Sequence, residues 1–212
     1  SIRFSIDPSA STAHEDDGIT HNGYARLLAA SLACLANIQG DSTGLYVFQN
    51  GGLFSLASRA DPHHLQRLYY QLEQIRPTGR FTKPAHYKEL FTGAGRKELL
   101  VFITDMYQAT GEISRLLDSL SALKHEIIVF QLMAQNELDL NFKGVTALQD
   151  LETGKTISVN TQHARKYHEK LQSQLAATRM ELLSKRIVHR VLNTSQPLDI
   201  ALRDFLVQRN KN

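Results

Sequence analysis

The chain has few of the residues that build disulfide-rich, zinc-binding or membrane-spanning proteins. It contains one cysteine, Cys34, and no tryptophan. A single cysteine excludes a disulfide framework and a cysteine-based zinc site, and it favours a reducing compartment. No apolar run approaches the roughly 20 residues of a membrane-spanning helix, and no signal peptide is recognisable. We therefore expect a cytoplasmic domain that makes no membrane contact of its own.

An excess of one charge is also missing. The 212 residues include 24 Lys and Arg against 21 Asp and Glu, with both signs intermixed. Without a basic run, nucleic acid is not an expected partner. No Gly-x-Gly-x-x-Gly follows the first predicted strand, which argues against dinucleotide binding. The length favours one domain over residues 1–212. Because the chain begins inside that strand, we expect an excised C-terminal part of a longer protein, and a membrane-anchored parent is compatible with this.

Predicted strands and helices alternate along the chain. Strands are predicted over residues 2–6, 43–49, 53–56, 99–104, 126–132 and 187–192, with a hairpin over 145–160. Helices are predicted after Gly23, from Pro62, over 84–91, 113–123 and 161–183, and from Pro197. This order predicts an α/β fold, a doubly wound and mostly parallel sheet with helices on both faces, in a Rossmann-type three-layer sandwich.

Two predicted elements have notable patterns. In the helix after Gly23, the apolar positions have helical spacing and predict an apolar stripe, and the alanines between them favour close packing on the sheet. That stripe consists of Tyr24, Leu27, Leu28, Leu32, Leu35 and Ile38. The first strand alternates polar and apolar residues, with Ser1, Arg3 and Ser5 on one face. A central strand is usually apolar on both faces, so we expect one face of this strand to be poorly covered.

The candidate chemistry begins directly after the first strand, at Asp7-Pro8-Ser9-Ala10-Ser11. One carboxylate and two hydroxyls in a tight loop offer the oxygen ligands that Mg²⁺ prefers, although a plain Asx-turn explains the pentapeptide equally well. Asp105 follows the strongly apolar strand 99–104, and Thr82 lies in a loop between the two acids. Ligands of doubly wound sheets bind beyond the carboxyl ends of strands, where Asp7 and Asp105 both fall.

This pattern resembles the metal-ion-dependent adhesion site of von Willebrand factor A domains. More narrowly, the chain is similar to the family called domain of unknown function 58, over nearly its whole length. The likeness includes Gln39-Gly40-Asp41, Ile103-Thr104-Asp105, residues 148–154 (LQDLETG), Tyr167 and residues 202–209 (LRDFLVQR).

The resemblance implies a set of metal ligands. Ser9, Ser11 and Thr82 would bind the ion directly, while Asp7 and Asp105 would hold it through water or neighbouring groups. Thr78 is a rival to Thr82, because the bulky Arg80 and Phe81 separate Thr82 from Gly79. Mg²⁺ is the expected cofactor, with Mn²⁺ or Ca²⁺ as substitutes. An open coordination position would accept an Asp or Glu from a protein partner, and relatives resemble adaptors of MoxR-type AAA+ ATPases. The implied function is non-enzymatic complex assembly or activation.

Two alternatives stay open. Asp7 is placed like the nucleophile of a haloacid-dehalogenase-like phosphatase, but the general acid/base expected two positions later is Ser9. A metal-free scaffold domain is the other alternative. His63, His64, His163 and His168 lack the i, i+4 spacing of a helical metal site, so we expect surface histidines there.

Overall fold

A six-stranded sheet forms the centre of the protein, in the order β10-β7-β6-β1-β4-β5. The computed structural model describes residues 1–49, 52–81, 97–108, 110–123, 125–139, 147–149, 151, 154–158 and 161–209. The strands are β1 (Ile2–Ile6), β4 (Thr43–Gln49), β5 (Gly52–Arg59), β6 (Leu99–Thr104), β7 (Glu126–Met133) and β10 (Ile187–Asn193). Neighbouring strands are parallel except β5, which runs antiparallel to β4.

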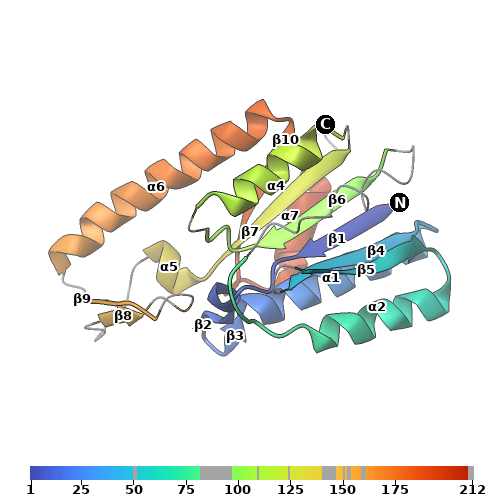
Figure 1. Ribbon diagram of the computed structural model, residues 1–212, viewed down its shortest axis with the longest axis horizontal. Coiled ribbons are helices and arrows are strands. Elements are labelled where there is room, and N and C mark those ends of the chain that lie inside the picture. The colour runs from blue at the N-terminus through green and yellow to red at the C-terminus, as the bar shows by residue number, and fades with distance from the viewer. Residues whose placement is uncertain are drawn as a thin grey trace.

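Helices cover both faces of this sheet (Figure 1). On one face, α1 (His21–Ile38), α2 (Pro62–Gln74) and α7 (Leu198–Arg209) pack against a core that includes Phe4, Ile6 and Phe130. On the other face, α4 (Glu112–Ser121) and the end of α6 (Thr161–Ser184) pack against Phe102, Val129 and their neighbours. The protein is therefore a mixed α/β domain with a mostly parallel sheet between helices, as the sequence predicts in outline.

Short elements complete the described chain. These are the 3₁₀ helix η1 (Ala10–Ala13), the strands β2 (Glu15–Asp16) and β3 (Ile19–Thr20), the helix α5 (Gln135–Asp139), and the hairpin of β8 (Ala147–Gln149) and β9 (Thr156–Ser158). The predicted helix over 84–91 lies outside the described residues. No described helix has the length and apolar character needed to cross a membrane.

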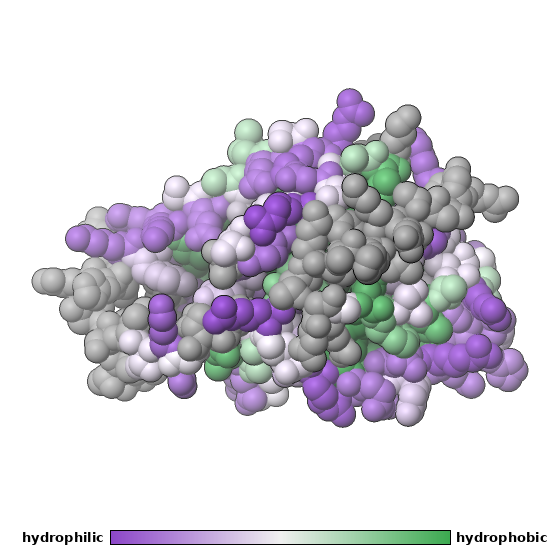
Figure 2. Space-filling view, in the orientation of Figure 1, coloured by the Kyte–Doolittle hydropathy of each residue, from purple (hydrophilic) through white to green (hydrophobic). Residues whose placement is uncertain are grey.

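The buried face of α1 differs from the predicted stripe. Leu27 and Ile38 are 60% and 77% exposed. The buried positions include Tyr24, Leu28 and Leu32 together with four alanines, Ala25, Ala29, Ala33 and Ala36. Small side chains allow the helix to approach the sheet closely, as the alanines predict from the sequence. The outer face of α2, along the lower edge in Figure 2, is mostly hydrophilic, as expected for an amphipathic surface helix.

The polar face of β1 is internally paired. Arg3 Nε lies 2.5 Å from Glu98 Oε2, and Glu98 is 7% exposed. The guanidinium of Arg3 also donates to the hydroxyl of Tyr46 and lies over its ring. The expectation of a poorly covered face is therefore wrong at Arg3, because a buried ion pair takes the place of apolar side chains. His64 is also buried rather than on the surface, with Nε2 2.6 Å from the carbonyl oxygen of Thr43.

Candidate metal-binding site at the carboxyl edge of the sheet

The site lies where the strand order reverses. β1 pairs in parallel with both β4 and β6. The chain passes from β1 to β4 on one side, and later from β6 to β7 on the other. Such a switch point opens a crevice beyond the carboxyl ends of the strands. Asp7 follows β1 and Asp105 follows β6, and the Asp7 amide donates a 3.1 Å hydrogen bond to the carbonyl of Ile103. The sheet register itself therefore brings the two acids to one edge.

Asp7 is a buried acceptor with both carboxylate oxygens occupied. Its Oδ1 accepts a 2.9 Å hydrogen bond from the Ser9 amide, and its Oδ2 accepts a 2.7 Å hydrogen bond from the Thr104 hydroxyl. Thr104 Oγ1 in turn accepts from the Met106 amide at 2.9 Å. With 1% of Asp7 exposed, this carboxylate holds the loop after β1 against the loop after β6.

The loop after β1 presents two hydroxyls side by side. Ser9 Oγ and Ser11 Oγ are 3.0 Å apart. The carbonyl of Ser9 accepts hydrogen bonds from both the amide and the hydroxyl of Thr12, at 3.0 and 2.8 Å. Thr12 is itself buried, so its hydrogen bonds hold the turn of η1 against the protein interior. The result is a pair of oxygen donors in a defined position next to the Asp7 carboxylate.

Asp105 supplies the second carboxylate. Its Oδ1 accepts a 2.9 Å hydrogen bond from the Tyr107 amide, across Met106 in the left-handed region at φ 60°. Burial raises the pKa of Asp105, against the lowering effect of hydrogen bonds from the Ser11 hydroxyl and the Tyr107 amide. Burial and then the charge of Asp105 raise the pKa of Asp7 to about 7. A buried carboxylate with a second, partly exposed carboxylate beside it favours a proton or a cation between them.

A third loop runs beside these two. The Thr78 amide donates a 2.8 Å hydrogen bond to the carbonyl of Pro8, and the Ala10 amide donates a 2.9 Å bond to the carbonyl of Gly79. Phe81 is anchored in the core, with ring centroids 5.4 Å from Phe48 and 6.1 Å from Phe102. The structure thus brings together Asp7, Ser9, Ser11, Asp105 and the backbone of Thr78. Thr82 lies outside the described residues.

Sequence reasoning missed the polar residues that flank Asp105. His21 is 1% exposed, and its Nε2 lies 3.0 Å from Glu137 Oε2. The charge of His21 lowers the pKa of Asp105, and that of Glu137 raises it. His21 begins α1 and Glu137 lies in α5, and no motif in the chain links them. Thr104, whose hydroxyl binds Asp7, could have been found from the sequence, because it directly precedes Asp105 at the end of the same strand.

The donor set is of the kind that hard cations prefer. In the described ranges, no group of three or more His, Cys, Asp and Glu side chains could hold a metal ion. The site at Asp7 and Asp105 instead combines two carboxylates with the hydroxyls of Ser9 and Ser11, a hard-oxygen set suited to Mg²⁺. The residues present therefore fit such a cation.

Fold and site together define a mixed α/β domain with a polar loop cluster at its switch point. The chain belongs to the family described as protein of unknown function DUF58, whose model matches residues 2–181. No curated protein matches the chain.

Solved structures share the fold at low sequence identity. The conserved hypothetical protein BatB of Bacteroides thetaiotaomicron has 16% identity and a TM-score of 0.58, with 100% of this chain and 98% of that chain covered. An aerotolerance-related membrane protein of Bacteroides fragilis NCTC 9343, solved with multiple mutations to serines, has 17% identity and a TM-score of 0.57 over the same shares. At these identities the likeness concerns the fold alone.

Proposed function

We propose that this protein is a metal-dependent protein-interaction domain of the von Willebrand A type, and not an enzyme. The observation that carries the proposal is the pair of hydroxyls, Ser9 Oγ and Ser11 Oγ, 3.0 Å apart beside the buried carboxylate of Asp7 and the partly exposed carboxylate of Asp105. Hydroxyls are weak ligands on their own, so a cation held by them keeps its affinity for an external carboxylate. The switch-point position is where doubly wound folds bind ligands.

In this proposal some residues bind the ion directly and others orient the loops around it. Ser9, Ser11 and a threonine of the third loop hold Mg²⁺ directly, with Mn²⁺ or Ca²⁺ as substitutes. Both oxygens of Asp7 already accept hydrogen bonds, which suits a group that orients the loop and balances charge rather than a direct ligand. Asp105, bonded to the Tyr107 amide, has the same role from the β6 side.

Mg²⁺ supplies an electrophilic position that an Asp or Glu of the partner completes. The MoxR-type AAA+ ATPase implied by the family resemblance is the first partner to test, with complex assembly or activation as the process served. In this proposal Tyr107, 41% exposed next to Asp105, forms part of the rim that the partner contacts.

A pull-down with immobilised protein, in Mg²⁺ or in EDTA, tests the proposal. We expect a MoxR-type ATPase, or another partner with an exposed acid, to be retained in Mg²⁺ and released by EDTA. Asp7→Asn should retain little of it, while its thermal unfolding shows that the fold is kept. The same partner retained equally in EDTA would make the domain a metal-free scaffold, and turnover of an aryl phosphate that Asp7→Asn abolishes would favour the phosphatase.

A further inference from the structure

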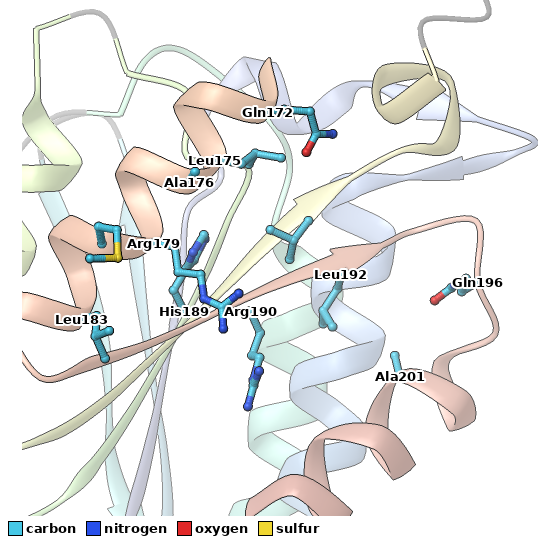
Figure 3. A pocket seen from close by; sticks show the side chains of 12 residues that line it. Gln172, Leu175, Ala176, Arg179, Leu183, His189, Arg190, Leu192, Gln196 and Ala201 are labelled. Carbon is cyan, nitrogen blue, oxygen red and sulfur yellow. The ribbon is translucent and has the colours of Figure 1, made fainter. Parts of the chain in front are cut away.

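The far edge of the sheet carries a second candidate binding surface, away from Asp7. β10 is an edge strand, hydrogen-bonded only to β7 among the described strands. A groove of about 750 Å³ follows it, between α6 on one side and the start of α7 on the other (Figure 3). His189 and Val191 project from one face of β10, and Arg190 and Leu192 project from the other. The groove therefore wraps around the open edge of the strand.

The polar lining of this groove is basic. Arg179 reaches from α6 towards β10, and Arg190 points from β10 towards the α7 side (Figure 3). The lining includes His189 and two glutamines and contains no Asp or Glu. No carboxylate of the described residues lies within 4.0 Å of either guanidinium.

One of these bases, Arg190, is incompletely satisfied. Arg190 Nε is buried and has no hydrogen-bond partner. His189 Nε2 lies 2.9 Å from Gln131 Oε1, and burial followed by the charges of Arg179 and Arg190 lowers the pKa of this histidine. A buried donor and a concentration of positive charge both favour an incoming anionic group, and guanidinium groups bind carboxylates in a planar, two-pronged geometry.

The rest of the lining is apolar, and part of it is open to solvent. The α6 side presents Leu175, Met180 and Leu183, of which Met180 and Leu183 are 66% and 62% exposed. An unpaired edge strand offers a row of free amides and carbonyls. Such an edge, between apolar and charged walls, suits the binding of a peptide as an additional strand. In that mode backbone hydrogen bonds supply affinity, and alternate side chains of the peptide supply specificity.

We propose that this groove binds an acidic, extended segment of a partner protein, which pairs with the open edge of β10. Alternate side chains of the added strand point to opposite faces. Acidic residues on those faces meet Arg179 and Arg190, and the apolar residues flanking them cover Leu175, Leu183 and Leu192. This contact goes beyond the proposed metal site, since β7 and β6 separate β10 from β1 in the sheet.

Phage selection of random heptapeptides on the Asp7→Asn protein in EDTA tests the proposal, because metal-linked binding of acids is then absent. We expect the selected peptides to carry adjacent pairs of Asp and Glu flanked by Val and Ile, because adjacent side chains of a strand point to opposite faces and so reach Arg179 and Arg190. Fluorescence anisotropy should show at least tenfold weaker binding of the best peptide to the Arg179→Glu/Arg190→Glu double variant. A lysine-substituted version of that peptide should bind the double variant better than the original protein. Hydrogen exchange should slow at residues 187–193 when the peptide is bound.

The matched control is Lys166→Glu/Lys170→Glu, the same charge change at two exposed positions of α6 outside the groove. It should bind the peptide within twofold of the parent, and Arg179→Gln/Arg190→Gln replaces the double reversal if that variant melts early. Failure to select peptides, selection without acidic bias, or equal binding by the double variant overturns the proposal. Displacement of the peptide by citrate at the concentration that saturates the groove would make this a small-anion site instead.

Discussion

The Thr104 hydroxyl donates a 2.7 Å hydrogen bond to Oδ2 of Asp7 and so joins the ends of β6 and β1. The Ser9 amide occupies the other oxygen of the same carboxylate. Asp7 is therefore the point at which two loops of the candidate site are held together, and the position of the Ser9 and Ser11 hydroxyls depends on it.

Thr104→Val should destabilise the protein by about 2 kcal/mol, because it leaves the buried Asp7 carboxylate without this donor and the Met106 amide without its acceptor. Urea unfolding measures the loss. Mg²⁺ affinity should also fall, since the Asp7 side chain loses one of its two fixed contacts.

Thr43→Val is the matched control for that substitution. Thr43 is fully buried and its hydroxyl has no hydrogen-bond partner. Replacing it by a methyl group should be neutral or should stabilise the protein by up to about 1 kcal/mol. If both variants lose the same free energy of unfolding, the Thr104–Asp7 hydrogen bond contributes nothing specific to stability.

The metal-free protein should lose stability as the pH rises from 4 to 7. Asp7 has a pKa of about 7 in the folded protein, above its ordinary value of 3.8. Across this window the folded state keeps a proton that the unfolded state has released, so its stability falls by at most about 1.4 kcal/mol per pH unit. Asp105, with a pKa raised in the same direction, adds to this slope. Urea unfolding in EDTA at several pH values measures it.

Asp7→Asn should flatten that slope, since the amide carries no titrating proton. Saturating Mg²⁺ should flatten it too, by favouring the ionised carboxylates. Affinity for Mg²⁺ should accordingly weaken as the pH falls below about 7. A slope that is the same in the wild type, in Asp7→Asn and in Mg²⁺ would mean that other groups dominate the pH dependence.

The third ligand can be assigned by a pair of valine substitutions. Thr82→Val should lower Mg²⁺ affinity at least tenfold, whereas Thr78→Val should leave it near the wild-type value. The Thr78 amide, which binds the carbonyl of Pro8, is kept in its variant, so the loop stays in place. Loss of affinity in the Thr78 variant alone would transfer the ligand role to that residue.

The buried pair of Arg3 and Glu98 should be strongly coupled. Arg3→Met leaves the nearly buried Glu98 carboxylate without its cation and should cost about 3 kcal/mol in unfolding free energy. Arg3→Met combined with Glu98→Leu should recover most of that loss, because two apolar side chains then replace the pair. Additive losses in the double variant would contradict a direct interaction.

The strand and helix order was predictable because it depends on local patterns. The apolar strands 99–104 and 126–132 and the helix start at Pro62 are confirmed by β6, β7 and α2. The alanines of α1 were expected to pack on the sheet and are buried, whereas Leu27 and Ile38 are apolar yet exposed. Which side chain reaches the core depends on how closely the helix approaches the sheet.

The candidate site divides in the same way. Asp7 and Asp105 were found from their places at strand ends, because parallel strands bring such ends to one edge. The Ser9 and Ser11 hydroxyls were found from their spacing. The contact between Glu137 and His21 was not predicted, because it joins α5 to α1 and no sequence motif connects residues so far apart in the chain. The identity of the metal ligands stays a prediction.

Calorimetric titration of Mg²⁺ into the wild-type protein, Asp7→Asn and Ser9→Ala/Ser11→Ala tests the central claim most directly. The account predicts a saturable heat for the wild type and at least tenfold weaker binding in both variants, with cooperative unfolding retained. Equal heats in all three proteins, or no saturable heat in the wild type, would contradict a metal site at the end of β1.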